Sequence, residues 1–416
     1  MERCLGWNSY ASSNVRRTRI AIWGLLALAA CDWKAPSPKC PATIAAVPPP
    51  FQPIVGGSVD AIPLEVTNNS AQTATSFWPD ESGGYFVLGV QTGTGAPWVA
   101  RFAAGGARLW ERILETTLPI RVAAPLTAGG VVILASDLAD NVTEVSAWWL
   151  SDDGTITTKQ NVTNIQGLSA VASLVDGGLL VAGETHLVRI GADHSITWAV
   201  PLEADPTSVT VLSQLAARPD GSCVVSYWRE APPGPWGSAV PARARAFSPA
   251  GASIWQQDYF GLDYKDATLR AEISVAPNGA LFLISRSETN PNMGDSFGGD
   301  WILNIDPSSG NPMTVGFAME WTECDNSNIT HIIPDSLGNL DIVVSRLAEQ
   351  GDTRPEQSSF LAQIDSTLVA KTAFELTLPS DSLLGPTRLA PNCIGWLDPT
   401  VPIRIIKVAT VGGGCK

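Results

Sequence analysis

The sequence predicts an all-β fold built from a repeated four-stranded unit, and three observations support this. The composition combines 37 glycines and 31 prolines with a charged fraction of only 16%. A short hairpin recurs along the chain, and so does a tight turn followed by an apolar run. Short apolar runs separated by Gly and Pro are typical of β-strands joined by turns.

The hairpin occurs in three close copies and three weaker ones. Each close copy has an apolar residue eight positions before a Trp: ARFAAGGARLW (100–110), VRIGADHSITW (188–198) and RAFSPAGASIW (245–255). Their tryptophans are Trp110, Trp198 and Trp255. The weaker copies have Thr158, Met313 and Thr372 at the position of the Trp.

Upstream of each hairpin lies a Gly- or Asn-containing turn followed by an apolar run. The copies are SGGYFVLGV (82–90), AGGVVILAS (128–136), DGGLLVAGE (176–184), DGSCVVSYW (220–228), NGALFLISR (278–286) and LGNLDIVVS (337–345), with a degenerate seventh at 391–397. The repeat unit is therefore strand, tight turn, strand, variable loop, strand, tight turn, strand. Successive turn glycines lie 43 positions (Gly178 to Gly221) to 59 positions (Gly279 to Gly338) apart.

A four-stranded antiparallel unit repeated at roughly 40–50 residues is the signature of a β-propeller blade. One blade cannot cover both of its faces, whereas blades packed around an axis cover one another. We therefore predict a single β-propeller over residues 54–416 with seven four-stranded blades, six or eight being the alternatives. The recurrent Trp is expected to fill the wedge between adjacent blades. Because the last unit ends before a full outer strand, residues 54–68 are expected to complete it, pairing N- and C-terminal strands.

The first 30 residues indicate an export signal. Arg16, Arg17 and Arg19 precede an uncharged run at residues 20–30. A helix of that length spans about 16 Å, which is too short to cross a bilayer core of ~30 Å. A basic segment followed by a short apolar run is typical of a secretory signal. Residues 28–31, Leu-Ala-Ala-Cys, resemble a bacterial lipobox. The resemblance implies cleavage between Ala30 and Cys31 and lipidation of Cys31; a plain cleaved signal with an incidental Cys is the alternative.

A lipid on Cys31 would anchor the chain in a bacterial cell envelope, facing the periplasm or the cell surface. The inner and the outer membrane are both open, since the effect of Asp32 on sorting differs between bacteria. Residues 31–53 contain seven prolines and predict a stiff tether. Removal of residues 1–30 changes the formal net charge from −14 to −17, which argues against nucleic-acid binding. We expect a monomer.

Seven cysteines become five when Cys4 is removed and Cys31 carries lipid. Disulfides are permitted outside the cytoplasm, and Cys393 with Cys415 is the first pairing we expect. Because five is odd, at least one thiol stays free or pairs between molecules.

The units resemble bacterial quinoprotein-like, or WD40-like, propeller repeats, which carry a Gly-x-x-x-Trp ending. Gly106 to Trp110 and Gly251 to Trp255 match that ending. Cofactor-using relatives hold a quinone and a calcium ion, but no residue set here carries over that pocket, so no cofactor is expected. The combination of lipobox and propeller is also similar to the non-catalytic propeller lipoprotein of the outer-membrane barrel assembly machinery.

Long loops after the second strand are predicted on one face, at 229–242, 287–300 and 347–359. Insertions gathered on one face are where repeat proteins usually bind, and Trp236, Phe297 and Trp301 are candidate anchors. The alternative is that these residues only cap the blades. Asp295 and Asp300 are candidate ligands of a structural Ca²⁺, although Asp is also an ordinary loop former.

The chain has three histidines, His186, His194 and His331, and no nucleophile motif. We therefore expect no enzymatic activity. The function predicted from sequence is an envelope lipoprotein whose propeller is a binding scaffold for a protein or glycan. The alternative is a propeller hydrolase or lyase acting on an envelope sugar, peptide or lactone, with His331 facing the central channel.

Overall fold

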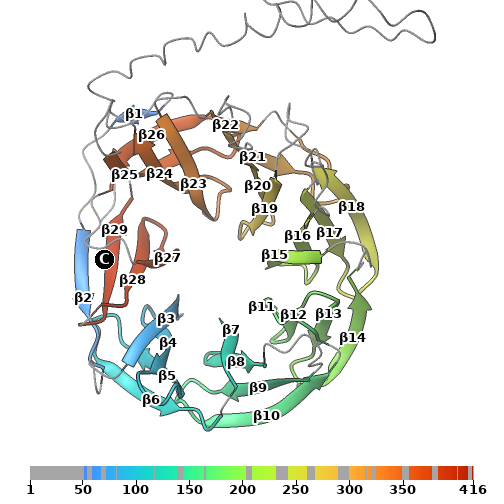
Figure 1. Ribbon diagram of the computed structural model, residues 1–416, viewed down its shortest axis with the longest axis vertical. Coiled ribbons are helices and arrows are strands. Elements are labelled where there is room, and N and C mark those ends of the chain that lie inside the picture. The colour runs from blue at the N-terminus through green and yellow to red at the C-terminus, as the bar shows by residue number, and fades with distance from the viewer. Residues whose placement is uncertain are drawn as a thin grey trace, which may run out of the picture. The chain divides into compact units, whose positions relative to one another are not determined.

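Seven β-sheets arranged around a central axis form the folded body, in a computed structural model of the chain (Figure 1). All described residues belong to one compact unit, residues 41–416. The structure describes residues 51–53, 59–66, 72–80, 82–116, 118–137, 144–163, 165–202, 209–230, 242–259, 268–288, 299–313, 316–320, 325–348, 356–376, 383–400, 402–410 and 415. None of them forms a helix that is long and apolar enough to cross a membrane.

Blades one to five each consist of four consecutive antiparallel strands, innermost first. Blade one contains β3 (Gln72–Pro79), β4 (Tyr85–Gln91), β5 (Pro97–Phe102) and β6 (Arg108–Ile113). Blade two contains β7 (Ile120–Pro125), β8 (Val131–Ala135), β9 (Glu144–Leu150) and β10 (Ile156–Thr163). Blade three contains β11 (Ala170–Ser173), β12 (Leu179–Ala182), β13 (His186–Ile190) and β14 (Ile196–Pro201). Blade four contains β15 (Val209–Ala217), β16 (Cys223–Glu230), β17 (Ala242–Phe247) and β18 (Ser253–Tyr259). Blade five contains β19 (Thr268–Val275), β20 (Leu281–Glu288), β21 (Gly299–Ile305) and β22 (Phe317–Glu320).

Both ends of the chain contribute to the last two blades. Blade six contains β23 (Asp325–Pro334), β24 (Leu340–Ala348), β25 (Glu356–Ile364) and β26 (Ala370–Glu375), with β1 (Gln52–Pro53) added in parallel to β26. Blade seven contains β27 (Leu384–Ala390), β28 (Cys393–Asp398) and β29 (Arg404–Ala409), and β2 (Val59–Pro63) is its outer strand. The predicted seven blades and the closure by residues 54–68 are confirmed, since β2 pairs antiparallel with β29.

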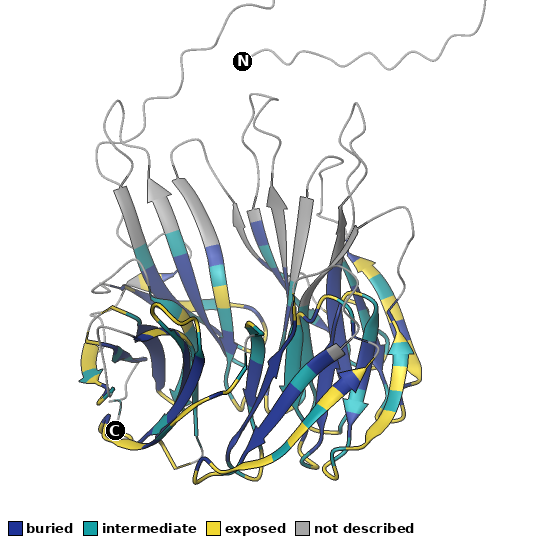
Figure 2. Cartoon of the chain, turned by 60° about the horizontal axis from the view of Figure 1, so that its bottom comes forward, coloured by how far each residue is buried: buried dark blue, intermediate teal, exposed yellow. Residues whose placement is uncertain are grey.

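Burial follows from the position of a strand in its blade (Figure 2). The second strands are covered on both sides, and β8, β12 and β28 are buried along their whole length. Their sequences are accordingly continuous apolar runs rather than alternating ones. The outer strands alternate, as β6 shows with Trp110 buried and its neighbours Leu109 and Glu111 more exposed. The hydrophobic clusters lie between sheets, so each blade depends on its neighbours for burial.

The three tryptophans occupy equivalent positions between blades, as predicted. Each indole N–H donates to a backbone carbonyl in the outer tight turn of the next blade, at N···O distances of 2.7–2.9 Å. The donor and acceptor pairs are Trp110 with Asp152, Trp198 with Pro249, and Trp255 with Pro307. We call the contact of an outer strand with the next blade's outer turn a seam.

Each of these rings packs on a glycine of the receiving turn. A Cβ on Gly154, Gly251 or Gly310 would lie only 2.6–2.9 Å from the ring of the preceding blade's Trp. All three glycines have φ between +76° and +82°, which L side chains rarely adopt. The Gly-x-x-x-Trp pattern therefore joins two seams, because its Gly faces the preceding blade and its Trp faces the following one.

The seam between blades two and three is built differently. Thr158 replaces the outer-strand Trp, and His194 replaces the glycine of the receiving turn, with φ of +65°. The His194 ring lies 4.7 Å from that of Trp149 and its Nδ1 lies 3.0 Å from the Thr158 hydroxyl. The space that a Trp fills elsewhere is therefore filled here by His194 from the opposite side.

The seam between blades five and six also lacks a Trp. Its receiving turn carries Leu368, the other described non-glycine residue with positive φ, at +64°. Leu368 is buried in one cluster with Phe317 and Phe51, whose ring centroids lie 5.4 Å apart. Phe51 precedes β1, so the end of the segment that we expected to be a tether packs into the propeller.

Candidate functional site

The predicted binding face lies at the ends of the strands opposite the tight turns. Among the anchors expected there, Trp236 and Phe297 lie outside the described residues, as does the candidate calcium ligand Asp295. Ala30 and Cys31 also lie outside them. The strands that carry these loops are described, and their lengths show how this face is shaped.

Blades four, five and six extend farther on the loop-rich face than the others. Their second strands have 8, 8 and 9 residues, against 7, 5, 4 and 6 in blades one, two, three and seven. Every second strand starts directly after a tight turn, so the added residues lie at the loop-rich end. At ~3.3 Å per residue the difference is roughly 13–17 Å from blade three and about 3–7 Å from blade one. The predicted long loops therefore follow three neighbouring blades that form a raised sector, defined by β15–β26.

Asp300 and Trp301 lie at the base of this sector on β21. Asp300 is fully buried, and its carboxylate accepts the backbone N–H of Ile329 on β23 of the next blade. This contact links blades five and six, so Asp300 has a structural role whatever else it binds. Trp301 is half-buried, and its indole N–H has no hydrogen-bond partner among the described residues. Within that part of the chain no group of three or more His, Cys, Asp or Glu side chains could hold a metal ion.

The three histidines lie in two blades, His186 and His194 in blade three and His331 in blade six. His194 belongs to the seam described above, and His186 contacts the hydroxyl of Thr185 at 3.0 Å. His331 lies on the innermost strand of blade six, where its Nε2 would be 3.9 Å from a Cβ on Gly385 of blade seven. The predicted position of His331 on an innermost strand is confirmed.

Cys393 and Cys415 form a disulfide, the pair expected from the sequence. It attaches the C-terminal end of the chain to the start of β28. Cys223 is a buried free cysteine on β16, and burial raises the pKa of its thiol to about 12. A thiol in that environment is an unreactive core residue.

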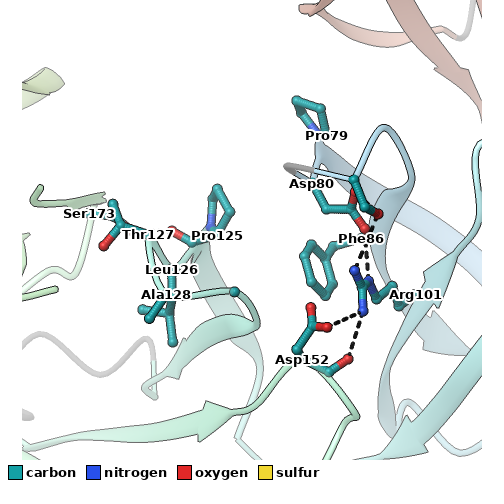
Figure 3. A pocket seen from close by; sticks show the side chains of 12 residues that line it. Pro79, Asp80, Phe86, Arg101, Pro125, Leu126, Thr127, Ala128, Asp152 and Ser173 are labelled. Atoms are coloured by element: carbon teal, nitrogen blue, oxygen red, sulfur yellow. Dashed lines mark hydrogen bonds and ion pairs between the residues drawn. The ribbon is translucent and has the colours of Figure 1, made fainter.

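A cavity of about 440 Å³ lies on the tight-turn face, between blades one and two. One wall carries an ion triad in which Arg101 lies between two carboxylates (Figure 3). Arg101 Nε donates to Asp80 Oδ2 at 2.8 Å, and Nη1 lies 2.6 Å from Asp152 Oδ2. The other wall comes from the inner turn of blade two and from Ser173 on β11.

Asp80 and Arg101 are both held in their charged forms. Burial disfavours the charge of Asp80, but hydrogen bonds from Ser82, Arg101 and the Gly84 N–H, together with the charge of Arg101, lower its pKa overall. Burial likewise opposes the charge of Arg101, yet hydrogen bonds to Asp80 and Asp152 raise its pKa.

Sequence reasoning missed this cavity because its charged residues are far apart in the chain. Asp80 and Asp152 are separated by more than one complete blade, so only the ring brings them to one guanidinium. One signal was present, since Arg101 and Arg189 stand directly before the first apolar residue of their hairpins. Both reach the next blade: Arg101 Nη1 donates to the Asp152 carbonyl at 3.0 Å, and Arg189 Nη1 to the Pro249 carbonyl at 2.6 Å.

No protein-family model and no curated protein matches the sequence. Several solved structures are similar in fold. The polysaccharide lyase Uly1 aligns with a TM-score of 0.53 and 10% identity, over 81% of this chain and 89% of that chain. YCF48 bound to D1 peptide aligns with a TM-score of 0.50 and 12% identity, over 87% and 99%. A puromycin hydrolase aligns with a TM-score of 0.51 and 14% identity, over 82% of this chain but only 52% of that chain.

At these identities the similarity shows the propeller fold alone. The same fold serves a lyase, a hydrolase and a protein bound to a peptide, so function must be argued from the site.

Proposed function

We propose that this protein is a non-enzymatic lipoprotein of the bacterial cell envelope whose propeller binds a protein or glycan through the raised sector. The observation that carries the proposal is the one-sided extension of blades four, five and six. Strand residues that continue past the common core need a reason other than ring packing, because blade three is complete with 4-residue second and first strands. Projecting strands support and orient the long loops that follow them.

The membrane part of the proposal depends on the lipobox resemblance at residues 28–31 and on the Pro-rich segment up to Pro53. Lipidation of Cys31 would hold the propeller at a membrane surface through a stiff spacer. Phe51 packs against Phe317 and Phe360, so such a spacer would be joined rigidly to blade six. Labelling with an alkyne-tagged fatty acid tests this: the wild-type chain should incorporate label and Cys31→Ser should not.

The binding part is tested by shortening the loops without shortening the core. Residues 231–241 and 289–298 are each replaced by a three-residue connection like that between Ala182 and His186 of blade three. The partner is identified first, by crosslinking in intact cells and mass spectrometry, and its affinity for purified protein is then measured. Loss of that affinity with an unchanged melting temperature supports the proposal. Unchanged affinity would show that the sector is not the binding surface.

A further inference from the structure

The cavity between blades one and two carries a net negative charge, and the packing of the blades does not require that charge. Its triad contains two carboxylates and one guanidinium, a formal charge of −1. The guanidinium is already engaged, since Arg101 donates to Asp80, to both the carbonyl and the carboxylate of Asp152, and to Ser82 Oγ at 3.3 Å. An anionic ligand would therefore meet more negative charge than positive charge in this cavity.

The carboxylate of Asp152 is not part of the recurring seam contact. In the seam between blades one and two, the Asp152 carbonyl accepts both Trp110 Nε1 and Arg101 Nη1. In the seam between blades three and four, the Pro249 carbonyl accepts both Trp198 Nε1 and Arg189 Nη1. A proline supplies the same backbone acceptor, so the structural role needs no side chain here. The Asp152 side chain is 57% exposed and lines the cavity.

The opposite wall offers acceptors and apolar surface. The Ser173 hydroxyl donates to the Pro125 carbonyl, and the Thr127 hydroxyl donates to the Leu174 carbonyl at 3.2 Å. Both hydroxyl hydrogens are thus committed, and the oxygens keep lone pairs for a donor. Pro79, Pro125 and Leu126 supply apolar lining. The cavity is complementary to a positively charged donor group on an aliphatic stem.

The surrounding face favours the same sign of charge. Its tight turns carry aspartates whose carboxylates accept backbone N–H groups two or four residues on: Asp80, Asp153, Asp176, Asp193, Asp220, Asp306, Asp335 and Asp365. Four of them are ion-paired with Arg101, Arg189, Arg218 and Lys371, so these aspartates outnumber the cations that pair with them. An excess of carboxylates raises the local concentration of cations and steers them toward the face.

The geometry points to a binding site for a primary ammonium group on an aliphatic stem, with Asp152 as its counter-ion. A lysine side chain of a partner protein and a free polyamine share this chemistry. The site lies on the face opposite the loops of the raised sector and uses none of its residues.

The test compares matched ligands on the full-length protein by calorimetry at low ionic strength. n-Butylammonium is the probe, and n-butanol, similar in size but uncharged, is its control. Asp152→Asn is expected to weaken n-butylammonium binding by about tenfold, the effect of losing one charge-assisted hydrogen bond. Asp153→Asn is the matched control, because among the described residues the Asp153 carboxylate bonds within its own turn, to Ser151 and Thr155, and should change binding less than about twofold.

Asp152→Asn keeps the backbone carbonyl of residue 152 and loses only the half-exposed ion pair with Arg101, whose contribution is small. Its melting temperature should therefore stay close to that of the wild type, and this verifies the fold. Equal binding of n-butylammonium and n-butanol, or equal effects of the two Asn variants, would overturn the inference. A peptide with one central lysine and putrescine then distinguish the two sources. Tighter binding of either supports the site and names its ligand; binding of neither contradicts it.

Discussion

Two neighbouring seams fill the same space between blades with side chains that come from opposite sides of the seam. Between blades one and two, Trp110 projects from the outer strand onto Gly154, and Arg101 reaches across from the adjacent strand. Between blades two and three, the outer strand carries Thr158 and the receiving turn carries His194. The adjacent strand there carries Trp149 at the register position of Arg101, and its ring contacts His194.

The residue on an outer strand and the residue in the receiving turn of the next blade are therefore coupled. At Gly154, Gly251 and Gly310 a Trp arrives from the preceding blade, and its ring occupies the space that a Cβ would need. In two seams without a Trp, the same turn carries a side chain at positive φ, His194 or Leu368. The outer turn of blade one also receives no Trp, but it keeps Gly106 because a Cβ there would clash with the Pro63 carbonyl oxygen. The strain of that backbone conformation, about 1–2 kcal/mol, is offset by the burial of Leu368 and by the contacts of His194 with Trp149 and Thr158.

The largest expected effect comes from the seam that is closed by the other end of the chain. Deleting residues 54–68 removes β2 from β29 and takes buried Leu64 from its cluster. Loss of Leu64 alone corresponds to about 2–5 kcal/mol, and the exposed edge of β29 adds to it. Differential scanning calorimetry should show a strongly lowered melting temperature. An unchanged melting temperature would refute closure by this segment.

Within the seam between blades one and two, Trp110→Ala should lower the free energy of unfolding by about 3–5 kcal/mol. Gly154→Ala should cost roughly 2–4 kcal/mol, because the Cβ meets the Trp110 ring and the residue keeps positive φ. Leu109→Ala is the matched control: Leu109 is 54% exposed beside Trp110, and its effect should stay within about 0.5 kcal/mol. Chemical denaturation measures the free energy of unfolding of all three variants. Similar losses for Leu109→Ala and Trp110→Ala would contradict the role of Trp110 in the seam.

The ion pair between Asp80 and Arg101 should make the stability of the same seam depend on pH. The folded pKa of Asp80 is below its unfolded value of about 4, so its contribution is present above pH 4 and is lost as the pH falls through the folded pKa. Asp80→Asn should cost about 2 kcal/mol at pH 7 and less at pH 3. A difference that does not change with pH would show that the charge of Asp80 does not stabilise the fold.

A smaller effect is expected at the seam between blades three and four. There the rate at which Cys223 is labelled measures how often the two blades separate. Cys223 belongs to a buried cluster against which the partly buried Trp198 packs, and the raised thiol pKa keeps Cys223 unreactive. Native protein treated with a maleimide should remain unlabelled at Cys223 for hours, and Trp198→Ala should label several times faster. Peptide mapping by mass spectrometry separates this site from other thiols. Equal rates would indicate that the Trp does not hold the seam closed.

Much of the fold could be predicted from sequence because its determinants are local. Trp110, Trp198 and Trp255 stand at one spacing within single hairpins, and the incomplete last unit indicated closure by the N-terminal segment. Other features depend on residues one blade apart or more. The exchange of Gly for His194, the packing of Phe51 on Phe317 and the triad around Arg101 join positions that no window of one repeat contains.

The coupling between Thr158 and His194 tests the seam account most directly. Thr158→Trp, His194→Gly and the double variant form a cycle, with the free energy of unfolding measured by denaturant titration. We predict that each single change destabilises, since the new ring meets His194 in one variant and a void remains in the other. The double change should recover at least about 2 kcal/mol relative to their sum. Additive effects of the two substitutions would contradict the account.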